Sequence, residues 1–487
     1  RLDLAGNNII GVKGFIETLL AILKSTLFFV PAGVYGSLLP DTSIYAHSKA
    51  MASIVHSYIR QRKSGTIKLA FKLLGIDING IQRFIGLIAQ HKAASKTFRG
   101  KSLYIELLQR ALTTYLLDEL GLTWVNVLGY EGGKVLLAVQ PAFLSSSLSK
   151  TITELEGTEL MNELGVTIAE SSEIREPITL KQLALAYSGD TRKLHPGTYA
   201  RALLELYKAL LKSRYTKEYT KLYIHDYEFD RLTHTPTPKG KELKVEGDIA
   251  KYVNELAPEA FELAGPEEYY SPRRSRYMSP LTHNTLVLGH VARNLVALIE
   301  LKVKDKERYR VLIGNIVNEL NKNLLTEEEP RLPIRRMWRI RVGGLSLRIG
   351  LVEYPTMNIA YILVAQDPID KTEPDPWNII IPLIKATLLK PLLAVMDKND
   401  TIRIIIVNNP EKTLPSTDRL EELRVLSKLV DKGVEISLDY WFTNTYHPVK
   451  VENNEIKKIK DIDEVTEEFK SKTGIVGLFA IAKMDGD

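Results

Sequence analysis

Cysteine is absent from the 487 residues of the chain. Structural disulfides, thiolate zinc sites and a cysteine nucleophile are therefore excluded. The absence suits a reducing compartment, and we expect a cytoplasmic location. Long apolar runs are also missing, because the most apolar stretch near the N-terminus, residues 14–40, contains Glu17, Lys24 and Pro31. A membrane-spanning helix needs about 20 consecutive apolar residues, so we expect no membrane partner, and no signal peptide is recognisable.

The composition is that of an ordinary globular protein, with 45% hydrophobic and 25% charged residues. At about 150 residues per domain, the length predicts about three domains. The net charge of +6 allows a nucleic-acid or phosphate-bearing partner and is equally compatible with a solvated basic surface. The chain begins with Arg1 instead of Met and ends on Asp487 within a strand-like run. We therefore expect it to be a piece of a longer protein.

The hydrophobic pattern changes along the chain and predicts a multidomain α+β fold. Residues 1–65 have helical spacing and predict a helical domain, whereas residues 66–180 mix strands and helices. Residues 181–330 have the pattern of a helical insertion, and residues 331–470 that of a mixed α/β connector. Residues 471–487 have the pattern of the start of a further α+β domain.

Residues 66–180 have the element order of a ferredoxin-like or palm-type sandwich. A strand-like run at 66–78 precedes a helix that starts after Asn79-Gly80, and a second helix is expected to start at Arg99–Ser102. Two strand-like runs then flank Gly132-Gly133, which is a hairpin signal. A helix and a strand complete the predicted unit.

The strongest chemical signal is Asp485-x-Asp487, which follows the apolar run IVGLFAIAKM. Side chains alternate along a strand, so the two carboxylates share one face. Mg²⁺ and Mn²⁺ prefer such oxygen ligands, and two ions about 3.5–4 Å apart can activate a hydroxyl nucleophile and steady a leaving pyrophosphate. The pair predicts a catalytic metal site, with a surface turn as the alternative. A similar pattern, Asp77-x-Asn79, indicates an internal repeat.

The segment FRGKS is a candidate nucleotide contact through Arg99, Lys101 and Ser102. At a helix start, backbone N–H groups favour an anion, and the two cations add to that preference. A solvated helix cap is the alternative. The segment is not a Walker loop, because the pattern GxxxxGK[ST] is absent from the sequence.

Asp77, Asn79, Gly132 and Gly133 are expected to border a nucleotide pocket in the first α+β domain. A catalytic palm hairpin carries acidic residues after its glycines, whereas Lys134 follows them here. We therefore expect this domain to be a nucleotide-binding or structural partner of a catalytic half.

A basic and aromatic segment, RLPIRRMWRIRV, is a candidate nucleic-acid surface. Its candidate residues are Arg335, Arg336, Trp338 and Arg339. Arginine pairs with phosphates and an exposed Trp can stack a base, although a salt-bridged, solvated face is the more frequent role.

Histidine is sparse, and His47 and His56 lie nine residues apart, which is not the spacing of one helix face. His47 is a candidate metal ligand only together with ligands that precede Arg1. A capping or surface role is the alternative.

Several segments, taken in order, resemble a known family. GIDINGIQRFI, FRGKSLYIELLQ and GYEGGKVLLAVQP resemble the first palm domain of the large subunit, the Cas ten protein of Csm type, of type III CRISPR–Cas effector complexes. GLFAIAKMDGD resembles the opening strand of that family's second palm domain. DTSIYAHSKAMASIV resembles the end of its N-terminal HD nuclease domain. The clear match covers roughly residues 38–145 and 468–487.

The resemblance implies a subunit of a crRNA-guided, RNA-targeting ribonucleoprotein. Paired palms of that family bind ATP and join it into cyclic oligoadenylates when target RNA is bound, and an intact HD domain cuts single-stranded DNA. The implied partners are crRNA, target RNA, single-stranded DNA and other Csm-type subunits, both the backbone repeat-associated and the small helical ones. Asp485 and Asp487 become ligands of Mg²⁺ or Mn²⁺, and Asp77 becomes the non-catalytic counterpart of Asp485.

Three departures from the family pattern bear on activity. The Gly-Gly-Asp-Asp hairpin is absent from the sequence, the HD signature reads Tyr45-Ala46-His47 without its acidic position, and the usual four-cysteine zinc site cannot form. These departures argue against nuclease activity and leave three functions open. They are an RNA-controlled oligoadenylate synthase, a non-catalytic scaffold for crRNA and neighbouring subunits, and a stand-alone nucleotide cyclase. The long helical insertion and the basic clusters argue against the third.

Overall fold

The computed structural model describes residues 12–28, 30–32, 43–63, 70–86, 94–140, 146–160, 163–175, 195–216, 227–229, 236–238, 243–244, 277–278, 280–323, 337–342, 345–366, 400–408, 435–442, 449–452 and 455–459. The chain divides into two compact units, Arg1–Trp441 and Phe442–Asp487. The second unit contains an antiparallel pair of strands, β15 (Val449–Glu452) and β16 (Glu455–Ile459). None of the described helices is long and apolar enough to cross a membrane.

The first sheet has four antiparallel strands in the order β2-β3-β1-β4. Its strands are β1 (Lys72–Asn79), β2 (Val127–Glu131), β3 (Lys134–Val139) and β4 (Gly165–Glu170). The intervening helices are α3 (Ile81–Gly86), α4 (Ala94–Glu119), the short η1 (Trp124–Asn126) and α5 (Ser146–Thr158). This is the ferredoxin-like order of elements that the sequence predicted.

The second sheet has six strands in the order β10-β11-β12-β9-β13-β14. Its strands are β9 (Leu295–Lys302), β10 (Met337–Val342), β11 (Leu345–Tyr354), β12 (Ile359–Gln366), β13 (Thr401–Asn408) and β14 (Glu435–Phe442). Its helices are α9 (Pro280–Val291), η4 (Ala292–Asn294), α10 (Lys306–Asn323) and η5 (Pro355–Met357). The four central strands, β11-β12-β9-β13, repeat the strand order of the first sheet.

The strands β10 to β14 lie within the mixed connector expected at 331–470, whereas β9 was not expected. The region expected to be a helical insertion, residues 181–330, contains β9 in the middle of the second sheet. The boundary expected at residue 330 therefore falls inside one sheet. All eight residues of β9 are buried. Such a run lacks the alternation of apolar and polar residues by which a strand is distinguished from a buried helix in the sequence. The start of the second palm domain, expected at 471–487, lies outside the described residues.

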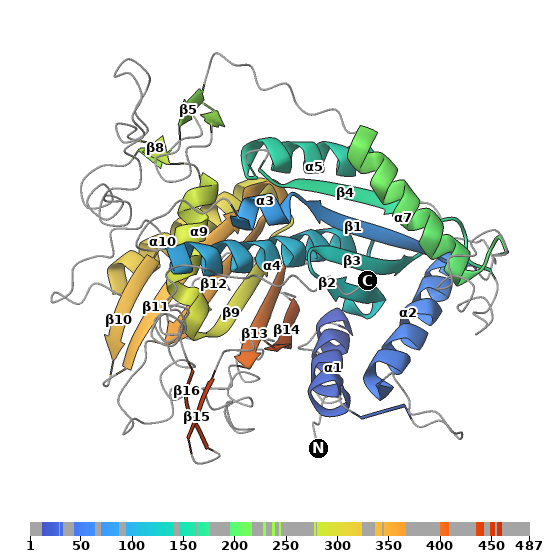
Figure 1. The fold of residues 1–487 in the computed structure, drawn as a ribbon, viewed down its shortest axis with the longest axis horizontal. Helices are drawn as coiled ribbons and strands as arrows, with labels where there is room; N and C mark the ends of the chain where they lie inside the picture. Colours follow the sequence, from blue (N-terminus) through green and yellow to red (C-terminus); the bar gives the residue numbers. More distant parts are fainter. Residues whose placement is uncertain are drawn as a thin grey trace, which may run out of the picture. The chain divides into compact units, whose positions relative to one another are not determined.

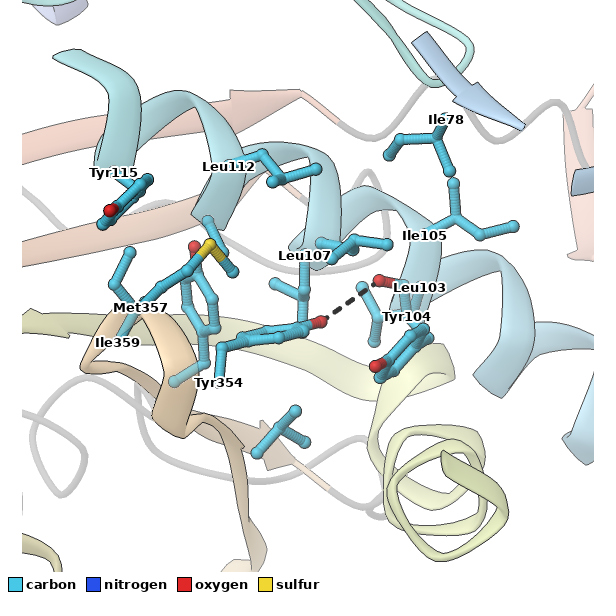
Figure 2. Packing of buried hydrophobic residues seen from close by; sticks show 14 of the residues in the cluster. Ile78, Leu103, Tyr104, Ile105, Leu107, Leu112, Tyr115, Tyr354, Met357 and Ile359 are labelled. Atoms are coloured by element: carbon cyan, nitrogen blue, oxygen red, sulfur yellow. Dashed lines mark hydrogen bonds between the residues drawn. The ribbon is translucent and has the colours of Figure 1, made fainter. Parts of the chain in front are cut away.

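Helix α4 contributes to the core on both of its sides (Figure 1). One continuous apolar cluster contains residues of β1 and β3, of α4 and α9, and of β9 and β12. Figure 2 shows Leu103 and Leu107 of α4 beside Tyr354, and the Tyr354 hydroxyl donates to the Tyr104 carbonyl at 3.3 Å. Apolar residues on two sides of one helix are typical of a position between two layers.

A buried ionic cluster joins α4 to the second sheet. Glu300 of β9, 2% exposed, accepts from Arg110 Nε at 3.2 Å and from Arg403 Nη1 at 2.7 Å. The second guanidinium nitrogen of Arg403 binds Glu17 of α1 (Val12–Leu27). Both arginines also lie over the ring of Trp124, at 4.8 and 5.1 Å from its centroid. Two positive and two negative side chains thus compensate each other inside the protein.

Two further helices pack on the face of the first sheet that α4 does not cover. They are α2 (Ile44–Lys63) and α7 (Tyr199–Thr216). Leu206 and Leu210 of α7 pack with Leu73 of β1, and Ile54 of α2 joins this cluster. The remaining described strands are short pairs: β5 (Tyr227–Phe229) with β6 (Pro236–Pro238), and β7 (Leu243–Lys244) with β8 (Tyr277–Met278).

Gly100 is predicted to be essential for the contact between α4 and α9. A Cβ atom at Gly100 would lie 1.9 Å from the carbonyl oxygen of Thr285, so Gly100→Ala should force the helices apart and lower the free energy of unfolding by about 2–3 kcal/mol. Gly314→Ala in α10 is the control, because nothing lies within 4 Å of that Cβ. The control should gain about 0.5–1 kcal/mol. Chemical denaturation measures both, and equal stability of the two variants would contradict the close contact.

Glu159 is predicted to make stability depend on pH. Burial raises the pKa of Glu159 to about 7. Its Oε1 accepts a hydrogen bond from Thr356 N at 2.7 Å, and this bond joins the end of α5 to η5. The unfolded pKa is near 4.3, so this contribution to stability is complete below about pH 4 and is lost as pH rises to about 7. Glu159→Gln should remove that dependence and raise the unfolding free energy at pH 8 by about 2 kcal/mol. Glu307→Gln, exposed on α10, should leave the pH profile of unfolding unchanged.

Candidate functional site

The end of β1 presents Asp77 and Asn79 on the face of the first sheet away from α4. Strand residues alternate, and Ile76 and Ile78 belong to the core cluster that contains α4. A Cβ atom at Gly75 would lie 3.0 Å from a leucine of α7. Asp77, two residues further along the strand, therefore faces the α7 side.

Gly132 and Gly133 form the two-residue loop of the predicted hairpin. Both have positive φ, 54° and 86°, which is typical of a type I′ turn. A Cβ atom at Gly133 would lie 2.3 Å from Cδ1 of Ile81, so this close approach requires glycine. The Gly133 carbonyl accepts from Ile78 N at 2.9 Å. The predicted residues of β1 and of the hairpin are thus brought together.

The side chain of Gln109, in α4, makes two hydrogen bonds to the hairpin where its loop enters β3. Its Oε1 accepts from Gly133 N at 3.0 Å, and its Nε2 donates to the Lys134 carbonyl at 2.9 Å. Gln109 is 1% exposed, so water does not compete for these two bonds. The position of α4 therefore fixes the position of the hairpin.

Asp77 lies among cations that come from different elements. It is in register with Lys134 of β3 and Thr167 of β4. Partial burial raises the pKa of Asp77, and the charges of Lys134 and of Arg214, near the end of α7, oppose this with a smaller effect. Lys134 and Arg214 are both exposed, so their charges are accessible to an anion.

Asn79 offers an unused acceptor beside Asp77. Its Nδ2 donates to Thr167 Oγ1 at 2.5 Å, whereas its Oδ1 is buried and has no hydrogen-bond partner among the described residues. A buried polar atom without a partner costs about 1–3 kcal/mol. A ligand hydroxyl or amino group can supply the missing donor.

The prediction of an anion site at FRGKS is wrong for Lys101. Helix α4 begins at Ala94, so the segment lies beyond its first turn. Lys101 is 1% exposed and its Nζ donates to the Phe84 carbonyl, near the end of α3, at 2.7 Å. Its charge therefore stabilises the negative end of another helix. Arg99 and Ser102 lie on α4, which packs on the other face of the sheet from Asp77, and the structure does not bring them to the site.

The basic and aromatic segment is described only in part. Trp338 and Arg339 lie on β10, the edge strand of the second sheet, and both are half-buried. The indole nitrogen of Trp338 donates to Asn321 Oδ1 of α10 at 2.9 Å. Trp338 therefore packs against a helix and is not the exposed base-stacking residue that was predicted. Arg335 and Arg336 lie outside the described residues.

No predicted metal ligand finds a partner set in the described ranges. Asp485 and Asp487 lie outside those ranges, and His47 is exposed on α2. His56 Nδ1 is 2.7 Å from Asn126 Oδ1 of η1, which is a structural contact. Within the part of the chain that the structure describes, no three His, Cys, Asp or Glu side chains gather to hold a metal ion.

Sequence reasoning missed three residues of this site. Gln109 directly follows the buried Leu107 and Leu108 of α4, but Arg110 is polar too, and no local pattern separates the two roles. Thr167 lies on the last strand of the predicted unit, where only the strand register identifies it. Arg214 lies beyond the expected boundary at residue 180, and no local pattern connects it with Asp77.

A protein-family model described as Csm1 subunit domain B matches residues 70–175, the range from just before β1 to just after β4. The chain is also 28% identical over 221 residues to a protein of Mycobacterium tuberculosis (strain H37Rv) named CRISPR system single-strand-specific deoxyribonuclease Cas10/Csm1 (subtype III-A). The predicted resemblance to the Csm1 family is confirmed. Domain B is accordingly the segment that carries Asp77, Gln109 and the glycine hairpin.

The curated relatives are much longer than the segments that align with this chain. The Mycobacterium alignment covers 39% of this chain and 27% of the relative. A relative of the same name from Streptococcus thermophilus is 30% identical over 156 residues, which is 29% of this chain and 20% of the relative.

Solved structures of the family overlap with this chain at low scores. The crystal structure of a Csm1–Csm4 subcomplex of the type III-A CRISPR–Csm interference complex gives a TM-score of 0.40 at 14% identity, covering 91% of this chain and 40% of that chain. The crystal structure of a Csm1–Csm4 cassette in complex with cA4 gives a TM-score of 0.32 at 15% identity. That match covers 85% of this chain and 60% of the cassette chain. The resemblance to the family rests on the domain B match and the curated relatives.

Gln109 is predicted to be the residue that positions the domain B hairpin. Gln109→Leu keeps the volume but removes the buried acceptor of Gly133 N and the donor to the Lys134 carbonyl, so the free energy of unfolding should fall by about 2–3 kcal/mol. The Gly133 amide should also exchange faster in hydrogen-exchange measurements. Gln82→Leu, exposed on α3, is the matched control and should change neither quantity. Unaltered protection of Gly133 in the Gln109 variant would refute this role.

Proposed function

We propose that this chain is part of the large subunit of a crRNA-guided type III interference complex. In this proposal its domain B binds ATP, and paired palm domains convert ATP to cyclic oligoadenylates when target RNA is bound. The observation that carries the proposal is the Gly132-Gly133 hairpin fixed beside Asp77 within a segment that matches Csm1 domain B. The hairpin and the polar end of β1 form one side of a nucleotide site.

The described residues supply groups that suit a nucleotide. Lys134 and Arg214 offer two accessible cations for its phosphates. Asn79 offers a buried acceptor for a ribose hydroxyl or a base amino group. Nothing lies within 4 Å of a Cβ built at Gly132, so a ligand can approach the backbone at the hairpin tip. Asp77 lies between these groups and can accept from a hydroxyl.

The catalytic metal is proposed to bind elsewhere in the chain. Asp77 has Lys134 and Arg214 as its charged neighbours, and this arrangement favours an anion over a cation. Mg²⁺ or Mn²⁺ is instead assigned to Asp485 and Asp487, at the start of the second palm. When bound, such an ion supplies charge stabilisation for the leaving pyrophosphate.

The proposed partners follow from the same assignment. They are crRNA, target RNA and other Csm-type subunits, including the backbone repeat-associated and small helical ones. The curated relatives are named single-strand-specific deoxyribonucleases, and single-stranded DNA is therefore included. The HD signature has Ala46 at its acidic position, so we propose DNA binding without assigning cleavage to the described residues.

A second candidate is a non-catalytic scaffold in the same complex. Two observations favour it. The Lys101 ammonium group is bound to the end of α3 and is not accessible to a nucleotide. Lys134 occupies the position at which a catalytic hairpin has an acidic residue. In this role domain B seats neighbouring subunits, and bound nucleotide is not converted.

ATP turnover is predicted to separate the two candidates. The assembled complex with crRNA, complementary RNA, ATP and Mg²⁺ or Mn²⁺ should make cyclic oligoadenylates. Lys134→Gln and Arg214→Gln should each raise the KM for ATP about ten-fold and leave kcat nearly unchanged, because they remove binding to the phosphates. Asp485→Ala combined with Asp487→Ala should abolish product while target-RNA binding persists.

The control for these variants is Lys150→Gln, an exposed cation of α5, which should leave the KM unchanged. An unchanged KM in both the Lys134 and Arg214 variants would remove the nucleotide site from the end of β1. A complex that binds target RNA but yields no product under any of these conditions would favour the scaffold.

A further inference from the structure

A row of three charged side chains crosses the hairpin end of the first sheet. The strands β2, β3 and β1 are neighbours in that sheet. Glu131 of β2 is in register with Lys134 of β3, and Lys134 is in register with Asp77 of β1. Directly opposed residues on neighbouring strands project from the same face of a sheet. Lys134 therefore lies between two carboxylates, on the face that α4 does not cover.

The dimensions of the sheet suit one cation between these two acids. Neighbouring strands are about 4.8 Å apart, so the backbones at Asp77 and Glu131 are separated by about 10 Å. Both acidic side chains can extend toward the Lys134 side chain between them. An ammonium group has three N–H donors. Two donors can serve the two carboxylates, and the third is then left for an oxygen of a phosphate.

The charges on this face resemble those of a site that already holds a divalent ion. The charges of Lys134 and Arg214 act on Asp77, and these two positive charges stand beside the carboxylates of Asp77 and Glu131. Mg²⁺ and Mn²⁺ require oxygen ligands and are repelled by neighbouring cations. Among the described residues, no three His, Cys, Asp or Glu side chains gather to hold a metal ion. The residues at the end of β1 therefore do not fit a divalent cation.

We propose that the ammonium group of Lys134 takes the place of a divalent cation in domain B, so that domain B binds its nucleotide without Mg²⁺ or Mn²⁺. This role rests on the proposed function, in which the nucleotide binds at the end of β1. Lys134 connects Asp77 and Glu131 to a phosphate oxygen, and the exposed Arg214 supplies the second positive charge. The hairpin position that holds a metal ligand in a catalytic palm thus holds the cation itself.

Photo-crosslinking of 8-azido-ATP to the full chain tests this role, because mass spectrometry assigns the labelled peptides to residues 70–175 or to other segments. Competition with ATP then gives the affinity of domain B separately. In the wild-type chain, the ATP concentration that halves labelling of domain B should be the same in EDTA and in Mg²⁺. Lys134→Gln should raise that concentration about ten-fold in both media, because one charge-assisted hydrogen bond is lost.

Lys134→Asp should make nucleotide binding depend on a metal ion. The variant places a third carboxylate between Asp77 and Glu131, so labelling of domain B should vanish in EDTA. Labelling should return with Mn²⁺, because carboxylate oxygens are ligands for that ion. Lys150→Asp, the same change at an exposed lysine of α5, is the matched control and should bind ATP like the wild-type chain in both media.

The outcomes separate this role of Lys134 from the proposed function. Labelling of wild-type domain B in Mg²⁺ but not in EDTA would overturn the role of Lys134 and leave the nucleotide site intact. Metal-independent labelling that neither Lys134 variant changes would assign Lys134 to an exposed cross-strand ion pair that only supports the hairpin. Absence of domain B labelling in both media would overturn the nucleotide site and this role together. The wild-type comparison needs no variant, so it decides the question even where a variant fails to fold.

Discussion

A carboxylate that is almost completely buried must have its charge compensated by nearby groups. Glu300 of the second sheet finds part of that compensation on α4, the helix that packs against the first sheet. Arg110 and Thr114 of α4 both bind it, while Arg403 and Tyr361 bind it from the neighbouring strands. A shift of α4 against the second sheet would leave charges unpaired in the interior, which costs about 3–5 kcal/mol per broken pair. The ionic cluster thus fixes a helix that apolar packing alone would allow to slide.

The fixed position of α4 is transmitted to the candidate site. Gln109 immediately precedes Arg110, so the helix that meets Glu300 on one side holds the hairpin at Gly133 on the other. Gly100 permits the close approach of α9 further along the same helix. The geometry of the hairpin therefore depends on the second sheet, although that sheet contributes none of the groups gathered around Asp77.

The local features of the site could be predicted from the sequence, and the long-range ones could not. The hairpin and the polar end of β1 follow from glycine placement and strand alternation, which act over a few residues. The burial of Lys101 depends on its contact with the end of α3, which is distant in sequence. A cation beside a glycine has the same sequence pattern whether it is buried or exposed. The charge of Arg214 acts on Asp77 only because α7 packs across the first sheet, and this packing is a long-range contact. The strand β9 was missed because burial on both faces erases its periodicity.

The two sheets place an acid at the same point of the same topology. Asp77 and Glu300 are each the sixth residue of an eight-residue central strand. Asp77 has Lys134 and Thr167 as its cross-strand neighbours, and Glu300 has Tyr361 and Arg403. The two sheets therefore share this arrangement, whereas the repeat predicted between Asp77-x-Asn79 and Asp485-x-Asp487 remains a prediction, because Asp485 and Asp487 lie outside the described residues.

The two acids differ in how their charge is compensated, and under the proposed function only Asp77 serves a ligand. In the second sheet a strand residue, Arg403, already neutralises the acid, and the face is closed by α4. In the first sheet the corresponding position is Thr167, a short hydroxyl side chain that binds Asn79 and brings no charge. The cations near Asp77 come instead from the exposed hairpin and from α7, and they remain accessible. In the first sheet a small polar residue thus takes the position that Arg403 has in the second, and the exposed cations around Asp77 are the ones that the proposed nucleotide site uses.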